Sequence, residues 1–189
     1  MFAEILERHL ACFKQLPDLE REVDDIAKRL SGVIAGGHKV LICGNGGSAA
    51  DAQHFAAELI GRFENERAAW PAVALTTDTS ILTAVGNDYG FDQVFARQVQ
   101  GLGRSGDALI GISTSGNSGN VIQAVQEARK LGMYTVGLLG KCGGAIKPLV
   151  DSAIVIDDPA TARIQEAHSF ILHYWALVIE NRICAARSE

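Results

Sequence analysis

Residues 40–48 read Val-Leu-Ile-Cys-Gly-Asn-Gly-Gly-Ser, and this stretch decides the fold class of the chain. Its four apolar residues do not alternate with polar ones, which predicts a strand buried on both faces of a parallel sheet. The glycines that follow predict a sharp turn, and Ser48 is expected to be the N-cap of the helix that starts there. A strand, a tight turn and a helix in this order indicate an α/β fold.

The same alternation continues along the rest of the chain, where short apolar runs predict strands and longer periodic stretches predict helices. The predicted strands are Val40–Cys43, Ala72–Leu75, Ala108–Ile112, Thr135–Leu139 and Ile154–Ile156. The helices predicted after the first strand are Ser48–Leu59, Gln93–Leu102, Asn120–Leu131 and Thr161–Ala186. This order predicts a doubly wound five-stranded parallel sheet with helices on both faces, and the longest predicted loop covers residues 61–71.

Two helical patterns precede the first predicted strand. The apolar positions of the first are Phe2, Ile5, Leu6 and Leu10, and those of the second are Val23, Ile26, Leu30 and Ile34. Gly36 and Gly37 end the second pattern. Because the sheet does not need this helical pair (residues 1–36) as cover, we expect the pair to pack between the subunits of an oligomer.

Length and composition limit the class of protein. The chain has 189 residues and 48% of them are hydrophobic, so one domain over residues 1–189 with a real core is expected. The net charge of −5 argues against a nucleic-acid-binding surface, which would need a basic patch. The four cysteines have neither metal-site nor disulfide-framework spacing. The sequence shows no signal-peptide pattern and no run of about 18 apolar residues, so a cytoplasmic location is expected.

A glycine-rich loop, residues 43–48, joins the first predicted strand to a helix. Glycines let a ligand approach backbone N–H groups, and a helix N-terminus attracts anions. The pattern is neither Gly-x-Gly-x-x-Gly nor a P-loop with its lysine. By itself, this loop is consistent with an anion site or with a plain strand–helix turn.

A second loop, residues 112–119, reads Ile-Ser-Thr-Ser-Gly-Asn-Ser-Gly and follows the third predicted strand. It holds four hydroxyl side chains, more than one helix cap requires, which favours a phosphate site over a capped polar connection. Ligands of open parallel sheets bind at the carboxyl ends of the strands, where both loops lie. We therefore expect the two loops to face one ligand.

Polar side chains on two predicted helices point to metal or acid–base chemistry. His54 and Glu58 are four residues apart and share a helix face, where they could hold zinc or exchange protons. A single His–Glu pair of this kind more often belongs to a solvated helix surface. This pair, however, lies within two turns of the glycine-rich loop. Spacing alone does not choose among four polar residues of the last predicted helix: Gln165, Glu166, His168 and His173.

A third motif, residues 82–91, reads Leu-Thr-Ala-Val-Gly-Asn-Asp-Tyr-Gly-Phe. Together with the two loops, and in this order, it resembles the phosphoheptose isomerase family of sugar isomerase (SIS) domain proteins. The resemblance covers nearly the whole chain and implies an SIS-type, flavodoxin-like fold and a homotetramer with sites between subunits. It implies that D-sedoheptulose 7-phosphate becomes D-glycero-D-manno-heptose 7-phosphate through an enediol. The resemblance makes this reaction the first step toward ADP- or GDP-heptose precursors, and the sequence leaves open whether these serve lipopolysaccharide biosynthesis, a surface-layer glycan or a capsule.

The resemblance also implies roles for individual residues. One zinc ion per subunit would be held by His54, Glu58, Gln165 and His173. Glu58 would be the catalytic base and His173 the acid, although a metal-bound group is less free to carry protons, and the sequence does not decide between these roles. The 7-phosphate would bind Ser113, Thr114, Ser115 and Ser118. The rest of the substrate would meet Asn45, Gly46, Gly47, Ser48, Glu58, Asn87, Asp88 and Gln165.

Two non-catalytic interpretations compete with the enzyme. A replication-initiator-associating protein resembles this family but lacks the carboxylate on the first helix of the sheet, and other SIS domains serve as sugar-phosphate sensors. Glu58 and His173 are both present in this chain, which favours catalysis. In the same resemblance His168 is interpreted as a structural residue, and Glu166 as a polar partner at a subunit interface.

Overall fold

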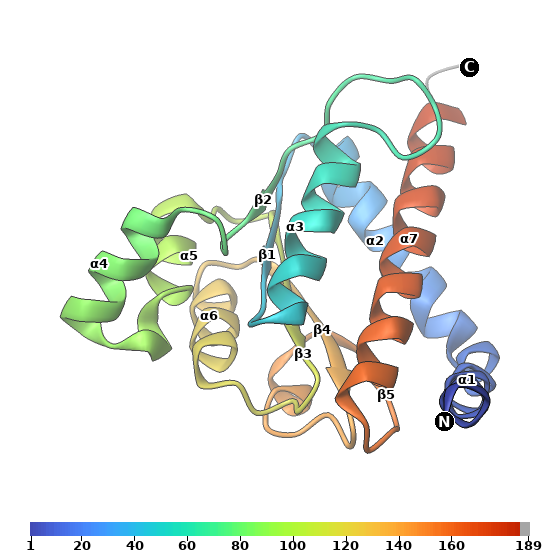
Figure 1. Cartoon of the computed structure of the whole chain (residues 1–189). Coiled ribbons are helices and arrows are strands. Elements are labelled where there is room, and N and C mark those ends of the chain that lie inside the picture. Colours follow the sequence, from blue (N-terminus) through green and yellow to red (C-terminus); the bar gives the residue numbers. More distant parts are fainter. Residues whose placement is uncertain (186–189) are drawn as a thin grey trace.

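The structure, a computed structural model, describes residues 1–185 and contains a five-stranded sheet (Figure 1). All strand pairs are parallel, and the strands lie in the order β2-β1-β3-β4-β5. The strands are β1 (Val40–Cys43), β2 (Ala72–Ala74), β3 (Ala108–Ser113), β4 (Tyr134–Gly140) and β5 (Ser152–Ile156). The predicted α/β class and the doubly wound parallel sheet are confirmed, and the strand ends differ from the prediction by one or two residues.

Helices cover both faces of this sheet, with α2, α3 and α7 on one side and α5 and α6 on the other (Figure 1). The expectation that the sheet does not need residues 1–36 as cover is therefore wrong for α2, which packs on α7 and β5. The helices are α1 (Phe2–Phe13), α2 (Glu20–Ala35), α3 (Gly47–Ile60), α4 (Thr79–Tyr89), α5 (Ala96–Leu102), α6 (Gly119–Lys130) and α7 (Thr161–Ala185). Short 3₁₀ turns lie at Leu16–Leu19, Phe91–Gln93 and Lys147–Leu149. The last residue of the predicted final helix, Ala186, lies outside the described residues.

Strand β1 illustrates how the sheet separates two apolar cores. Val40 and Ile42 belong to the core under α2, α3 and α7, whereas Leu41 and Cys43 belong to the core under α5 and α6. Neighbouring side chains of a strand point to opposite faces, so an unbroken apolar run fills both cores. Desolvation of the fully buried Cys43 raises the pKa of its thiol to about 12, which makes this residue an inert packing group.

Helix α4 is the element that the sequence patterns do not predict. It has no buried residue and extends away from the body of the sheet (Figure 1). Asp78 is its N-cap and accepts a hydrogen bond of 2.9 Å from the Ile81 N–H. A helix that buries no face in its own chain carries no clear apolar period, so periodicity does not reveal it.

The expected N-cap role of Ser48 is wrong. Helix α3 begins at Gly47, its N-cap is Gly46 with φ 57°, and Ser48 is buried within the first turn. A positive φ costs glycine little, so the chain turns before it reaches the serine. A Cβ atom on Gly44 would lie 2.8 Å from the Ser48 Cβ atom, which shows how closely the loop folds over this side chain.

The order of the strands determines where a ligand can bind. Strands β1 and β3 are neighbours, yet the chain leaves β1 toward β2 through α3 and leaves β3 toward β4 through α6. The two connections therefore diverge onto opposite faces and open a crevice at the carboxyl ends of β1 and β3. Within residues 1–185, every helix is too short or too polar to cross a membrane.

Candidate functional site

The loops that follow β1 and β3 lie side by side, as the sequence predicts. The side-chain amides of Asn45 and Asn120 exchange two hydrogen bonds of 2.9 Å, which join the first loop to the start of α6. Asn120 is 2% exposed, so water competes little for these bonds. Sequence reasoning did not identify Asn120, whose only signal is its position just inside the predicted helix.

The first loop also touches the last helix. Any side chain at Gly47 would collide with the amide group of Gln165, which lies directly against this glycine. Gln165 comes from the first turns of α7, so the loop after β1 is enclosed between α7 and α6. A side chain at residue 47 would have to displace the flexible Gln165 amide, so this glycine and α7 approach each other closely.

The second loop gathers the hydroxyl groups that the sequence singles out. The Ser113 Oγ atom lies 2.9 Å from Ser118 Oγ and 3.4 Å from Ser115 Oγ. Thr114 lies between them in sequence, and its carbonyl oxygen packs against Gly140. Ser118 immediately precedes α6, so the hydroxyl groups stand at the positive end of a twelve-residue helix. This arrangement can bind an anion.

The loop after β4 supports this hydroxyl cluster from behind. The Ile146 N–H donates to the Gly116 carbonyl at 3.0 Å, and the Ala145 N–H donates to the Asn117 Oδ1 atom at 2.9 Å. Residues 143–146 of this loop thus lie beside the second loop.

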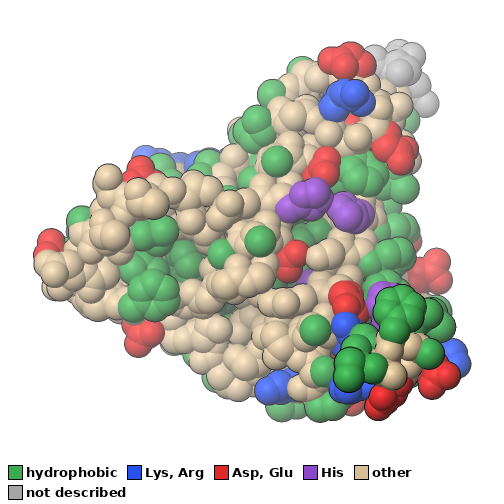
Figure 2. Space-filling view, in the orientation of Figure 1, with side chains coloured by type: hydrophobic (Ala, Val, Ile, Leu, Met, Phe, Trp, Pro, Cys, Tyr) green, Lys and Arg blue, Asp and Glu red, His purple; other side chains and the backbone are tan. Residues whose placement is uncertain are grey.

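Three ionisable side chains from two helices meet beside these loops. The His54 Nε2 atom lies 2.8 Å from His173 Nε2 and 3.2 Å from Glu58 Oε1, and the three groups can place ligand atoms within 4.8 Å of one another. The His54 side chain is 51% exposed and that of Glu58 is 20% exposed. Figure 2 shows neighbouring histidine side chains at the surface over α3 and α7.

This cluster has the chemistry of a metal centre. Only one hydrogen can lie between the two Nε2 atoms. The two nitrogens therefore share either one proton or one cation. Two imidazole nitrogens and a carboxylate oxygen form a donor set typical of zinc. The i, i+4 spacing of His54 and Glu58 on α3 was predicted, and the packing of α3 on α7 adds His173 from the other helix.

Gln165 is the fourth metal ligand that the family resemblance implies. It precedes His173 by eight residues on α7, and its amide lies against Gly47 at the first loop. The structure brings His54, Glu58 and His173 together, and the ligand role of Gln165 stays a prediction.

Asn87 and Asp88 lie on α4 and are exposed, and the Asn87 amide donates a 2.8 Å hydrogen bond to the Asp88 carboxylate. Helix α4 packs mainly on the 3₁₀ turn at residues 91–93 and lies at the end of the molecule away from α7 (Figure 1). Asn87 and Asp88 thus lie on the helix that leads into this 3₁₀ turn, and Asp92 of the turn lies against Gly119 at the end of the second loop.

The other polar residues of α7 have structural partners. His168 is fully buried and hydrogen-bonds through Nε2 to the Leu139 carbonyl at 3.0 Å, and burial lowers its pKa to about 4. It is thus a neutral donor within the core, as its structural interpretation predicts. Glu166 pairs with His9 at 2.8 Å and with Arg163, so it ties α1 to α7.

Asp51 is a residue near the cluster that sequence reasoning missed. It lies on α3 three residues before His54, and its Oδ1 atom accepts a 2.8 Å hydrogen bond from Ser169 on α7. Its Oδ2 atom is buried without a hydrogen-bond partner. Desolvation raises the Asp51 pKa, while Ser169 and the charges of His54 and His173 act to lower it. The i, i+3 spacing to His54 was the signal that could have identified it.

Comparison with known proteins gives consistent matches. Residues 6–140 match the SIS domain family. The chain is 55% identical to a phosphoheptose isomerase of Geobacter sulfurreducens, over 89% of this chain and 91% of that protein. It is 62% identical to a phosphoheptose isomerase of a Nitratiruptor species, over 75% and 76% of the two chains. The solved phosphoheptose isomerase of Neisseria gonorrhoeae superposes with a TM-score of 0.91 and 44% identity, covering 95% of this chain and 97% of that one.

Proposed function

Because the chain belongs to the phosphoheptose isomerase family of SIS domain proteins and is an isomerase, we propose that it converts D-sedoheptulose 7-phosphate into D-glycero-D-manno-heptose 7-phosphate. The observation that carries this proposal is the meeting of His54, Glu58 and His173 beside two loops at the topological switch point. Aldose–ketose isomerisation needs a base at carbon and an acid at oxygen, and this cluster holds both kinds of group.

The second loop is the proposed seat of the 7-phosphate. The Ser113 hydroxyl group lies within hydrogen-bond distance of those of Ser115 and Ser118, and Thr114 belongs to the same loop. Hydroxyl groups rotate to donate or accept, and the first N–H groups of α6 lie at the same place. A phosphate monoester can be held by hydroxyl and backbone N–H groups in this way.

The sugar is proposed to lie between the first loop and α7. Its reacting end would then reach the cluster while its tail rests on the second loop. The contact between Gln165 and Gly47 and the Asn45–Asn120 amide pair support this placement, because they line the crevice with polar groups. The proposed sugar-binding residues are Asn45, Gly46, Gly47, Ser48, Glu58, Asn87, Asp88 and Gln165.

In the proposed mechanism, Glu58 takes a proton from C1 of the ketose while His173 donates one to the C2 oxygen, which gives the enediol. His173 then removes the proton of the C1 oxygen, and Glu58 returns its proton to C2, which gives the aldose. Both residues end in their starting protonation states. The contact of each with His54 holds them on one side of the crevice, at positions set by two different helices.

The cluster fits a zinc ion, which we propose as the resident metal. His54, Glu58 and His173 would hold it, and Gln165 would join them only if its amide turned away from Gly47. A bound zinc would polarise the carbonyl group and stabilise the enediolate. A carboxylate has two oxygens, so Glu58 can contact a cation through one and accept the substrate proton through the other.

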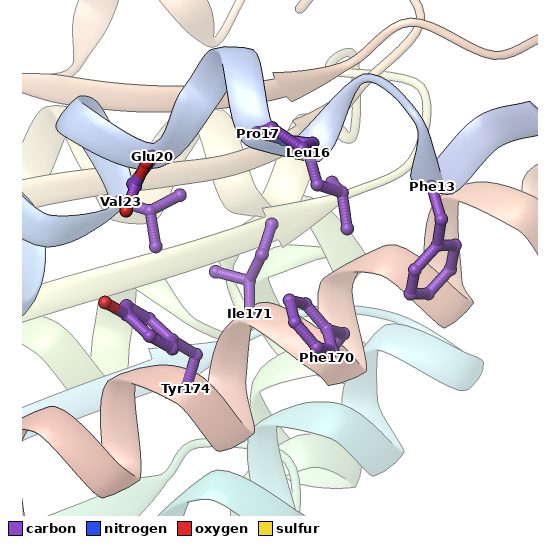
Figure 3. Close-up of a pocket in the computed structure, with 8 residues that line it drawn as sticks. All are labelled: Phe13, Leu16, Pro17, Glu20, Val23, Phe170, Ile171 and Tyr174. Carbon is purple, nitrogen blue, oxygen red and sulfur yellow. The ribbon is translucent and has the colours of Figure 1, made fainter.

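A homotetramer with sites between subunits is the proposed assembly. The apolar face of α1 is open, with Phe2 81% exposed, and α4 buries none of its residues. An apolar pocket of about 390 Å³ lies between the N-terminal helices and α7, with Phe13, Phe170 and Tyr174 among its walls (Figure 3). Among the described residues that line this pocket, Glu20 alone is charged. Exposed apolar surfaces of this kind are suited to binding a second copy of the chain.

This assembly would explain the position of Asn87 and Asp88, since α4 could carry them to the site of a neighbouring subunit. A mixture of two inactive variants, Glu58→Gln and Asp88→Asn, tests the idea. Subunit exchange should restore part of the activity if one site uses Glu58 of one copy and Asp88 of another. A monomeric mass in solution, or no recovery in mixed oligomers, would contradict it.

The product would need activation by a nucleotide, so we place the reaction at the first step toward ADP- or GDP-heptose precursors, such as those of lipopolysaccharide, in the cytoplasm. The decisive experiment is turnover of D-sedoheptulose 7-phosphate by the purified zinc-loaded chain, with Glu58→Gln and His173→Gln as controls. We expect turnover by the wild type alone. Tight binding without turnover in the wild type would replace the enzyme with a sugar-phosphate sensor. Association with a replication initiator, again without turnover, would favour the other non-catalytic role.

A further inference from the structure

A second charged pair joins the same two regions as the proposed catalytic cluster. Arg67, in the loop after α3, lies 3.2 Å from Glu180 on α7. The two side chains are 4% and 0% exposed, so this pair is sealed from water, unlike the cluster that contains Glu58. Burying two charges costs desolvation free energy, so a buried pair by itself is weak evidence for stabilisation. The other contacts of the two side chains therefore show what the pair does.

Arg67 closes the end of the helix that carries Glu58. Helix α3 ends at Ile60, and the following Gly61 has φ −77°, so the usual left-handed glycine cap is absent from this helix end. The last carbonyls of the helix therefore need other donors. Arg67 donates to the Glu58 carbonyl at 2.7 Å and to the Leu59 carbonyl at 2.9 Å. The main chain of the proposed base is thus held directly by this side chain.

Arg67 itself has little freedom to move. Its guanidinium group lies 3.6 Å from the centre of the Trp70 ring and also donates to the carbonyls of Gly61 and Ala68. A planar group with several fixed donors can satisfy this set of acceptors, whereas the single ammonium group of lysine cannot.

Glu180 secures the other half of the arrangement. It follows His173 by seven residues on α7, so both side chains lie on one helix face. Its carboxylate accepts the backbone N–H groups of Phe63, Glu64 and Asn65 at 2.8–3.3 Å. The Phe63 ring then packs on the His173 imidazole, with ring centres 5.9 Å apart and planes inclined by 30°.

We propose that Arg67 and Glu180 are positioning residues for the catalytic centre. They hold the last turn of α3, which carries Glu58, at one height on α7, which carries His173, and they seat Phe63 against the His173 ring. The inference rests on the proposed function for the roles of Glu58 and His173. The pair acts through the backbone and through Phe63, and it need not touch the substrate.

The test compares Arg67→Lys with Arg129→Lys in the full-length chain. Arg129 is an exposed arginine of α6 that also donates to a backbone carbonyl, that of Leu149 at 2.7 Å, so it is a matched control. We expect Arg67→Lys to lower zinc affinity by about tenfold to a hundredfold, because supports of metal ligands have effects of this size. It should lower kcat by at least about tenfold and change KM less than threefold, because positioning affects the chemical step. Arg129→Lys should change each quantity less than twofold.

Zinc affinity is measured by competition with a chromophoric chelator, which requires no turnover. If the wild type binds zinc but does not isomerise the sugar, the proposed function fails while the metal measurement still decides the positioning role. A folded Arg67→Lys protein with wild-type zinc affinity and kcat would overturn the inference and leave the pair a purely structural one.

A second variant keeps the inference testable if Arg67→Lys does not fold. Phe63→Leu leaves the Arg67–Glu180 pair in place and removes the ring that packs on His173. We expect its metal-free protein to show displaced imidazole NMR signals for His173, assigned with His173→Gln, together with a several-fold lower kcat. Unchanged His173 signals and kcat in Phe63→Leu would show that the loop does not position this residue, and would also overturn the inference.

Discussion

Two charged clusters join α7 to α3 and the loop that follows it, and they differ in almost every physical respect. The first, His54 with Glu58 and His173, is partly open to solvent, and its nitrogen and oxygen atoms converge on one point. The second, Arg67 with Glu180, is buried, and its groups are hydrogen-bonded to backbone carbonyls and N–H groups. Each contains a glutamate beside a basic side chain, so residue type does not separate them.

The two clusters differ in solvent exposure and in whether their polar atoms are already fully hydrogen-bonded. Buried charges that are fully hydrogen-bonded resist change, because any rearrangement leaves a charge without a partner in a medium of low polarity. Groups at the surface of a crevice, with lone pairs that face each other, can accept a cation or a proton at small cost. Substitutions in the first cluster should therefore remove activity with little loss of stability, and substitutions in the second should lower both stability and activity.

The largest effect is expected for Glu58→Gln, which keeps the shape of the side chain and removes its basicity. Turnover of sedoheptulose 7-phosphate should fall by about 10²–10⁴-fold, the usual contribution of a general base. The free energy of unfolding, measured with urea on the metal-free protein, should change by less than about 0.5 kcal/mol because the residue is not part of a sealed network. Activity within threefold of wild type would end the contrast between the clusters.

The next effect is on stability. Arg67→Met leaves the Glu180 carboxylate buried without its charge partner, so the free energy of unfolding should fall by about 3–5 kcal/mol. The double variant Arg67→Met, Glu180→Leu removes both charges and should recover part of this loss, which urea unfolding would reveal. An Arg67→Met variant as stable as the wild type would mean that the Arg67–Glu180 pair does not hold α7 to the loop after α3.

A smaller effect concerns the buried His168 of α7. The His168 pKa is lowered from 6.5 to about 4 by burial, so the folded state binds fewer protons than the unfolded state between these values. Its stabilising contribution is therefore present above pH 6.5 and is lost as the pH falls toward 4, about 3 kcal/mol in all. Urea unfolding of the metal-free protein from pH 7.5 to 4.5 should show a shallower loss for His168→Gln than for wild type. Equal slopes for His168→Gln and the wild type would refute the assignment.

The smallest effect concerns the phosphate seat, which lies away from both clusters in sequence. Ser113→Ala removes a hydroxyl group that contacts two others, and KM should rise about tenfold, the value of one hydrogen bond to a charged group. Zinc affinity should not change. The control is Ser105→Ala, which lies before the amino-terminal end of β3, at the other end of the strand from Ser113. Its KM should match that of the wild type. A KM within twofold of wild type for Ser113→Ala would move the phosphate away from this loop.

The parts of the molecule that the sequence predicts well are those with local signals. Unbroken apolar runs such as residues 108–112 identify strands, because a strand buried on both faces has no polar side. Helix α4 escapes this reasoning because it buries nothing in its own chain. Serine is a residue type typical of helix N-caps, but α3 begins before Ser48 because Gly46 adopts a positive φ. Residue type alone does not determine this backbone angle.

The candidate site divides in the same way. The i, i+4 pair of His54 and Glu58 is predicted because covalent spacing and helix geometry put both on one face. The choice of His173 over Glu166 and His168 follows from the rotation of α7 against the sheet, which turns His168 inward toward Leu139 and leaves His173 beside His54. Asn120 and Asp51 were missed because their partners lie far away in the chain.

The sequence by itself therefore determined the α/β class, the two loops at the strand ends and the helical pair of ligands, since each is encoded within one or two turns of chain. Only the tertiary structure decided which α7 residue completes the cluster, and that Arg67 and Glu180, 113 residues apart, form one pair. The physical reason is that periodicity is a property of neighbouring residues, whereas contact between distant side chains depends on how rigid elements rotate and pack against each other.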